Sequence, residues 1–285
     1  MSKKLLFFTL FLLVVLSVSL FAVKEAKLNI PSPNYDIPAI ITTPDAVGNY
    51  PGIVMVHGFG SEKNEVGNFY KRLSEKLADN GIASIRFDFP GSGDHALGFE
   101  HTDINRMITD TLFVLEWFEE NGNIDTDKIG LLGFSLGGVV GSYVAGNDER
   151  IKALGLWSTP GNMAVSQSDL YESVYPETLE KDYVEVDLGW RKINLTKEYF
   201  ESRYSVFPLF EITKYHNPLL VIAGENDELQ PEYARQFAVR AGSFDVRLVI
   251  IPEGDHIYQV LTEDQTMAEE VMNLTNDWFT KKLMH

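Results

Sequence analysis

The sequence feature that most constrains the fold is a Gly-x-Ser-x-Gly pattern at Gly133, Ser135 and Gly137. An apolar run, residues 129–132, comes before it, and small and apolar residues, 139–143, come after it. A strand that turns at once into a helix strains the serine backbone, and side chains two residues before and after the serine would collide. Glycines remove that collision. The pattern is common by chance, but its place between a buried strand and a helix predicts an exposed, nucleophilic Ser135.

The length and charge of the chain limit what else it can be. Its 285 residues are enough for one large α/β domain with an insertion. The formal net charge is -17 and no basic stripe is present, which argues against a nucleic-acid partner, because binding to phosphate backbones depends on clustered Lys and Arg. The chain contains no cysteine, so its fold depends on packing without disulfides.

The first residues form a separate segment. Lys3 and Lys4 precede an almost unbroken apolar run from Leu5 to Val23, which is typical of an export signal. The run also approaches the roughly 20 residues that span a bilayer. Residues 1–22 are therefore interpreted as a signal peptide or an uncleaved membrane anchor, and both readings predict an exported protein, periplasmic or extracellular.

Beyond this segment, strand patterns and helix patterns alternate along the chain. Continuous apolar runs typical of buried strands occur at 52–56, 82–87, 129–132, 151–157, 217–223 and 246–251. Helical spacing occurs at 68–80, 103–120, 233–241 and 263–281. Residues 38–44 predict a short outer strand, and the proline-rich residues 28–38 predict an irregular lead-in. The alternation predicts an α/β fold, a doubly wound and mostly parallel sheet with right-handed crossovers.

The alternation stops between residues 159 and 208. This segment is rich in Tyr and Glu and has no buried-strand run. A bare loop of that length is uncommon in a compact domain. We predict that residues 28–158 and 209–285 form the core and that residues 159–208 form a small, partly helical cap inserted over the active site. A helical crossover with surface aromatic residues is the alternative.

A serine hydroxyl needs a base within hydrogen-bond reach and a third group that orients the base. Among the six histidines, His256 lies in a loop just after the last predicted strand and before the final helix. Ligands of parallel sheets bind outside the carboxyl ends of the strands, where this loop and Ser135 both lie. Asp227 follows the preceding strand, so the order Ser135, Asp227, His256 predicts a catalytic triad. The rival carboxylates are Glu225 and Asp255, although neighbouring side chains such as those of Asp255 and His256 diverge.

The turn 57–60, with the sequence His-Gly-Phe-Gly, ends an earlier predicted strand. It can point the N–H of Phe59 toward Ser135. Together with the N–H of Leu136, at the positive end of the following helix, this group would hold the oxyanion of a tetrahedral intermediate. We expect His57 to brace the loop rather than to take part in the chemistry.

These segments resemble the α/β-hydrolase superfamily, and within it they are most similar to bacterial serine esterases of the cinnamoyl and feruloyl esterase type. The segments that carry the resemblance are His57 to Gly60, Arg86 to Gly93, Gly133 to Gly138, Gly224 to Pro231 and Asp255-His256. It covers roughly residues 38–157 and 211–279 and leaves the cap unassigned. The resemblance implies a triad at Ser135, Asp227 and His256, an oxyanion hole at Phe59 and Leu136, no cofactor, and a cap that shapes the acyl pocket.

Two departures from that esterase type affect specificity. Phe134 and Leu136 stand where the cinnamoyl-type motif usually has His and Gln, and its Asp-Phe-Asn-Gly-His-Gly turn here contains Pro90 and Ser92. The triad prediction is unaffected, because the oxyanion contacts use backbone N–H groups. A preference for phenolic acids does not follow.

The sequence thus predicts a serine carboxylic-ester hydrolase that forms an acyl-enzyme on a small-molecule ester with a neutral, aromatic or short-chain acyl group. We expect no metal and no nucleic-acid partner, and a membrane contact only through the N-terminal segment. An amide or peptide hydrolase of the same fold, and a catalytically silent binding protein, are the alternatives. The sequence leaves the natural ester and the oligomeric state open.

Overall fold

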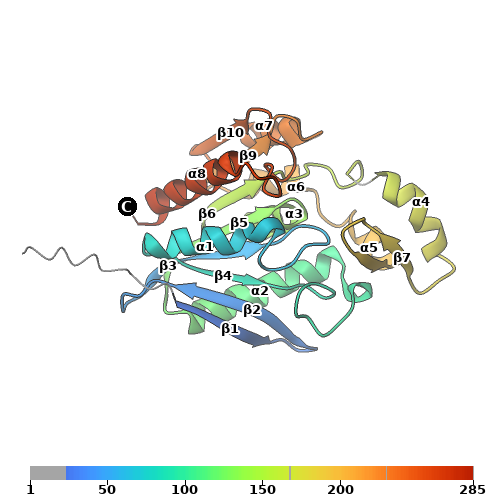
Figure 1. Ribbon diagram of the computed structural model, residues 1–285, viewed down its shortest axis with the longest axis horizontal. Coiled ribbons are helices and arrows are strands. Elements are labelled where there is room, and N and C mark those ends of the chain that lie inside the picture. The colour runs from blue at the N-terminus through green and yellow to red at the C-terminus, as the bar shows by residue number, and fades with distance from the viewer. Residues whose placement is uncertain (1–23, 167, 229, 285) are drawn as a thin grey trace, which may run out of the picture.

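The computed structural model describes residues 24–166, 168–228 and 230–284 (Figure 1). The predicted signal peptide or anchor, residues 1–22, lies outside the described residues. Within the described ranges, none of the helices combines the length and the apolar character that a membrane span requires.

Eight strands of the described chain form one large sheet, in the order β1-β2-β4-β3-β5-β6-β9-β10. These strands are β1 (Lys24–Pro31), β2 (Asp36–Thr43), β3 (Tyr50–Val56), β4 (Ala83–Phe87), β5 (Ile124–Phe134), β6 (Ile151–Trp157), β9 (Leu219–Gly224) and β10 (Val246–Ile251). Strands β4, β3, β5, β6, β9 and β10 pair in parallel, and β1 and β2 join antiparallel at one edge. The predicted α/β class with a mostly parallel sheet is confirmed.

Strand β1 is where the sequence prediction is wrong. The irregular lead-in expected at 28–38 is largely a hairpin, because β1 pairs with β2 along its whole length, from Lys24 opposite Thr43 to Pro31 opposite Asp36. Most of β1 is exposed, so it has no apolar run that could reveal it as a strand. Its order comes from pairing with the buried β2 rather than from its own composition.

Helices cover both faces of the sheet, as expected for a doubly wound fold. They are α1 (Phe69–Asp79), α2 (Ile104–Asn121), α3 (Leu136–Asn147), α7 (Gln230–Arg240) and α8 (Thr266–Leu283). α1 and α8 lie on one face, and α2, α3 and α7 lie on the other (Figure 1). Successive residues of β3 alternate between the two cores, since Ile53 packs with the first set of helices and Val54 with the second.

The final helix begins later than the sequence suggested. We expected it from Glu263, directly after the loop that holds His256, but α8 begins at Thr266 and residues 263–265 are irregular. Shorter elements complete the core: η1 (Val66–Asn68), η2 (Phe99–His101), α6 (Pro208–Glu211) and η3 (Ile212–Lys214).

The segment between β6 and α6 projects from one end of the sheet (Figure 1). It contains α4 (Ser168–Thr178), β7 (Val184–Asp187), β8 (Lys192–Leu195) and α5 (Lys197–Ser202). β7 and β8 form an antiparallel pair. This hairpin was not predicted from the sequence, because each strand has four residues and is partly exposed. Residues 159–208, predicted as the cap, therefore hold helices and a small two-stranded sheet.

Candidate active site

Ser135 sits between the end of β5 and the first residue of α3. Its backbone has φ 52° and ψ -120°, a conformation that residues other than glycine rarely adopt. A Cβ atom at Gly133 would overlap the backbone of Gly137, and one at Gly137 would overlap the carbonyl oxygen of Val56. The strained backbone at Ser135 and the need for glycine at positions 133 and 137 agree with the prediction from the sequence.

The structure brings Ser135, His256 and Asp227 together from three separate loops. His256 Nε2 lies 3.0 Å from Ser135 Oγ, and His256 Nδ1 lies 2.8 Å from Asp227 Oδ2. The Asp227 carboxylate is buried, with 7% of the residue exposed. Because a carboxylate only accepts, Nδ1 carries the proton in this arrangement, and the lone pair of Nε2 faces the serine hydroxyl.

The rival carboxylates do not contact the imidazole. Glu225 Oε2 accepts the N–H of Glu253 at 3.1 Å, and Asp255 Oδ1 accepts the N–H groups of Ile257 and Gln259 at 3.1 and 2.8 Å. Both side chains stabilise the loop around the histidine. Of the three candidates, Asp227 is the one placed to orient the imidazole.

The sequence predicts that the N–H groups of Phe59 and Leu136 hold the oxyanion, and both residues lie in segments that border the serine. Leu136 is the first residue of α3. The loop that holds Phe59 contacts the serine directly, since a Cβ atom at Gly58 would lie 3.4 Å from Ser135 Cβ. Within the described chain, neither the Phe59 nor the Leu136 N–H donates to another protein group. The two groups stay the predicted donors of the oxyanion hole.

His57 lies in the same loop and braces it. Its Nδ1 donates to the carbonyl oxygen of Gly58 at 2.9 Å, and its Nε2 accepts the N–H of Phe89 at 3.4 Å. The residue is 2% exposed, and its ring packs against that of Phe89 at 4.8 Å. It does not reach Ser135 through a hydrogen bond.

A cavity of about 730 Å³ opens over the serine. Its wall is mostly apolar, with Phe59, Phe134, Trp190, Ile257 and Leu261 among the lining residues. This combination of an apolar wall and a few polar groups is typical of a small-molecule site.

The hairpin of the inserted segment closes one side of this cavity. Trp190 Nε1 and Arg191 Nη1 both lie 3.4 Å from the carbonyl oxygen of Gly60. Arg191 also donates to the carbonyl oxygen of Gly91. Burial lowers the pKa of Arg191 from its usual value. The tip of the hairpin thus rests on the loop that carries Phe59.

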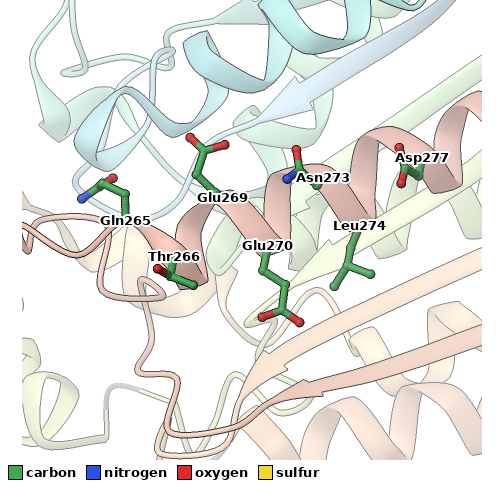
Figure 2. A pocket seen from close by; sticks show the side chains of 7 residues that line it. All are labelled: Gln265, Thr266, Glu269, Glu270, Asn273, Leu274 and Asp277. Carbon is green, nitrogen blue, oxygen red and sulfur yellow. The ribbon is translucent and has the colours of Figure 1, made fainter.

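A second hollow, of about 680 Å³, lies along the outer side of α8 and is shown in Figure 2. Glu269, which helps to line it, pairs with Arg72 and Lys76 at 2.5 and 3.0 Å. Its described lining contains neither serine nor histidine, so we assign the active site to the cavity over Ser135. In the described ranges, no three His, Asp or Glu side chains are grouped as metal ligands would be.

The model of the alpha/beta hydrolase family matches residues 53–271, which include the whole of this site. The chain belongs to the alpha/beta hydrolase family. The match covers the serine turn, both loops that follow β9 and β10, and the inserted segment. The suspected superfamily is thereby confirmed.

Individual relatives of this alpha/beta hydrolase are distant. The chain is 24% identical over 228 residues to 2,6-dihydropseudooxynicotine hydrolase of Paenarthrobacter nicotinovorans, with 77% of this chain and 56% of that protein covered. It is 26% identical over 277 residues to an uncharacterised 31.7 kDa protein of Escherichia coli, with 84% and 94% covered. The chain thus spans little more than half the length of the Paenarthrobacter nicotinovorans hydrolase.

Among solved structures, Est1E from Butyrivibrio proteoclasticus with ferulic acid bound has a TM-score of 0.74 and 22% identity. The similarity covers 90% of this chain and all, 100%, of that one. At that identity the likeness supports the fold.

Several pocket residues of this hydrolase were not predicted. Trp190 and Arg191 reach the site through a hairpin that the sequence did not reveal. Glu65 lies in the cavity wall although it is only 4% exposed. One feature of the sequence could have indicated Glu65. It follows closely after the His-Gly-Phe-Gly turn, and that turn is expected to lie close to the serine.

Proposed function

We propose that this protein is a serine carboxylic-ester hydrolase that works through an acyl-enzyme intermediate. The observation that carries the proposal is the continuous set of contacts from Asp227 through His256 to Ser135, which opens into an apolar cavity. A strained serine turn, a base at hydrogen-bond distance and a buried carboxylate behind that base are the parts that such chemistry requires.

In the proposed reaction, Ser135 Oγ attacks the ester carbonyl carbon while His256 Nε2 takes the hydroxyl proton. The N–H groups of Phe59 and Leu136 stabilise the oxyanion that forms. When the intermediate collapses, His256 returns the proton to the departing alcohol. Water then attacks the acyl-enzyme while His256 takes a proton from it, the bond between the acyl carbon and Ser135 Oγ breaks, and His256 returns the proton to Ser135 Oγ as the acid leaves. Asp227 stabilises the imidazolium in both steps.

The proposed substrate is an ester with a neutral aromatic or short-chain acyl group. The apolar wall of the cavity supports this class, and its volume of about 730 Å³ is in the range of small-molecule sites. The structural neighbour Est1E holds ferulic acid, an aromatic acid. Phe134 and Trp190 offer ring surfaces for such a group.

A substrate panel tests the proposal. The purified chain is assayed with p-nitrophenyl esters of increasing acyl length, with methyl ferulate and with a p-nitroanilide, beside Ser135→Ala as the control. We expect hydrolysis of short or aromatic esters that is lost in Ser135→Ala while the far-ultraviolet spectrum stays unchanged. Faster turnover of the anilide would replace the esterase by an amide hydrolase, and equal rates for both proteins would refute the proposal.

A further inference from the structure

Glu65 is a buried carboxylate in the wall of the active-site cavity, and the proposed reaction assigns it no step. It ends the loop between β3 and η1, with a backbone φ of 61° and ψ of 167°. Residues other than glycine rarely adopt this conformation, and they do so where surrounding contacts hold them, often at functional sites. The contacts of its side chain identify what holds it.

The carboxylate accepts three hydrogen bonds from its own loop. Oε2 accepts the N–H of Gly58 at 2.7 Å, and Oε1 accepts the N–H of Val66 at 2.9 Å and the hydroxyl of Ser61. In the part of the chain that the structure describes, Glu65 forms no ion pair. This buried charge is therefore balanced by loop donors alone, and two of them flank Phe59 and Gly60.

These contacts fix the peptide that carries the Phe59 N–H. The carbonyl oxygen of Gly58 accepts from His57 Nδ1 at 2.9 Å and from the N–H of Ser61 at 3.3 Å. The Phe59 N–H belongs to the same planar trans peptide unit, so it points away from those two donors. Glu65 occupies the preceding N–H, that of Gly58, and thereby limits rotation of this peptide from the other side.

We propose that Glu65 is a positioning residue for the oxyanion hole: its carboxylate holds Gly58 and Ser61 so that the N–H of Phe59 faces the reacting carbonyl oxygen at Ser135. The inference rests on the proposed function. It assigns Glu65 no proton transfer and no substrate contact, because its oxygens already accept from the loop.

The loop has other anchors, so loss of the Glu65 charge should change its alignment rather than unfold it. Lys63 Nζ pairs with the buried Asp88 at 2.5 Å, and the Lys63 N–H donates to the same carboxylate at 2.8 Å. Trp190 and Arg191 contact Gly60 from the hairpin side. The role of Glu65 is therefore separable from the stability of the loop.

The test compares Glu65→Gln with Glu75→Gln. Glu75 is exposed on α1 and is not among the described residues that line the cavity. A glutamine at position 65 keeps the shape but presents an NH2 group to one of the two backbone N–H donors. For each protein we measure kcat and KM on the best ester, Tm, and the affinity of a trifluoromethyl ketone, whose adduct with Ser135 places a charged oxygen in the oxyanion hole.

For Glu65→Gln we expect kcat to fall by about 10- to 100-fold, below the 10²- to 10³-fold typical of losing an oxyanion donor outright. KM should change by less than about threefold, and ketone affinity should fall by the same factor as kcat/KM. Glu75→Gln should stay within about threefold in kcat, KM and ketone affinity. Unchanged kcat and ketone affinity in Glu65→Gln, or a lower Tm with unchanged ketone affinity, would overturn the inference.

Two further results keep the test decisive. If Glu65→Gln does not fold, Ser61→Ala removes one of the three hydrogen bonds, and the same ketone readout should then weaken by about three- to tenfold, an unchanged affinity counting against the inference. If the wild-type protein neither hydrolyses esters nor binds the ketone, the proposed function fails, and the role of Glu65 fails with it.

Discussion

The sheet and the inserted segment, residues 159–208, differ in how firmly their side chains are packed. The strands that lead to Ser135 and Asp227 are buried on both faces, and the six residues of β9 are all buried. In the inserted segment, the large side chains of Leu179, Tyr183 and Trp190 are 57%, 49% and 71% exposed. Its core is a small hydrophobic cluster that includes Leu195 and Phe200 and packs against Phe59.

We infer from this difference in packing that the sheet and the inserted segment have different roles. Groups that must hold a fixed geometry to react lie at the ends of buried parallel strands, where packing limits movement. Groups that shape the cavity lie on a hairpin with few buried neighbours, and such regions open at low free-energy cost. Phe59 joins the two regions, since its ring contacts Phe99 at 5.6 Å and Tyr199 at 5.5 Å.

The largest expected effect lies on the sheet side, at Asp227. Asp227→Asn keeps the size of the side chain but no longer holds the proton of His256 on Nδ1, so we expect kcat/KM to fall by about 10⁴-fold. Asp255→Asn is the matched control, because its carboxylate caps the loop without contacting the imidazole. Steady-state kinetics on one ester measures kcat/KM for both variants. A larger loss of kcat/KM in Asp255→Asn would assign the role of orienting His256 to Asp255 instead.

The next prediction compares two leucines that are both 0% exposed, Leu132 in β5 and Leu195 in β8. Leu132→Ala should lower the free energy of unfolding by about 2–5 kcal/mol, the usual cost of such a cavity. Leu195→Ala should lower it less, because a segment that opens on its own can cost the whole molecule no more than its local stability. The main effects of Leu195→Ala should be a raised KM and faster proteolysis within the inserted segment, residues 159–208.

Urea denaturation of the two leucine variants measures both unfolding free energies. Equal losses would show that the inserted segment unfolds together with the sheet, and the division between the two regions would then be wrong.

The smallest expected effect comes from a carboxyl group that is buried within the sheet region. Asp110 on α2 is 2% exposed, and its carboxylate accepts the hydroxyl of Tyr35 at 2.8 Å. Burial raises the pKa of Asp110 from 3.8 to about 6. Because the folded state then binds the proton more tightly than the unfolded state, stability falls as pH rises between these two values, by up to about 3 kcal/mol.

Asp110→Asn removes this titration while keeping an oxygen for Tyr35. Relative to the wild type, the variant should gain stability as pH rises from about 4 to 7, and urea denaturation across that range would detect the gain. Glu116→Gln, exposed on the same helix, should show no such trend. A difference curve for Asp110→Asn that is flat with pH would contradict the prediction.

The strands that consist of continuous apolar runs were predictable from the sequence. Buried parallel strands must be apolar on both faces, so β3, β5, β6 and β9 were evident, and the segments after β5 and β9 led to Ser135 and Asp227. The apolar run of β10 in the same way led to His256 in the loop that follows it. The β1 strand and the β7–β8 hairpin were missed, because exposed strands carry no such pattern and depend on their partners.

Glu65 was missed for a different reason. In the sequence it is one of several charged residues in a polar stretch, and its significance depends on a strained φ of 61° and on three hydrogen bonds within one loop. No periodicity records that geometry. Trp190 was similarly one of many aromatic residues until the hairpin placed it over Gly60.

The most direct test of the account is the mass of the intact chain after treatment with a fluorophosphonate, followed by peptide mapping. The reagent requires an activated serine, and the contacts of Ser135 with His256 at 3.0 Å supply the activation. We predict one adduct per chain, located on Ser135 and absent from Ser135→Ala. No adduct, or an adduct on another serine such as Ser92 or Ser142, would contradict the central claim.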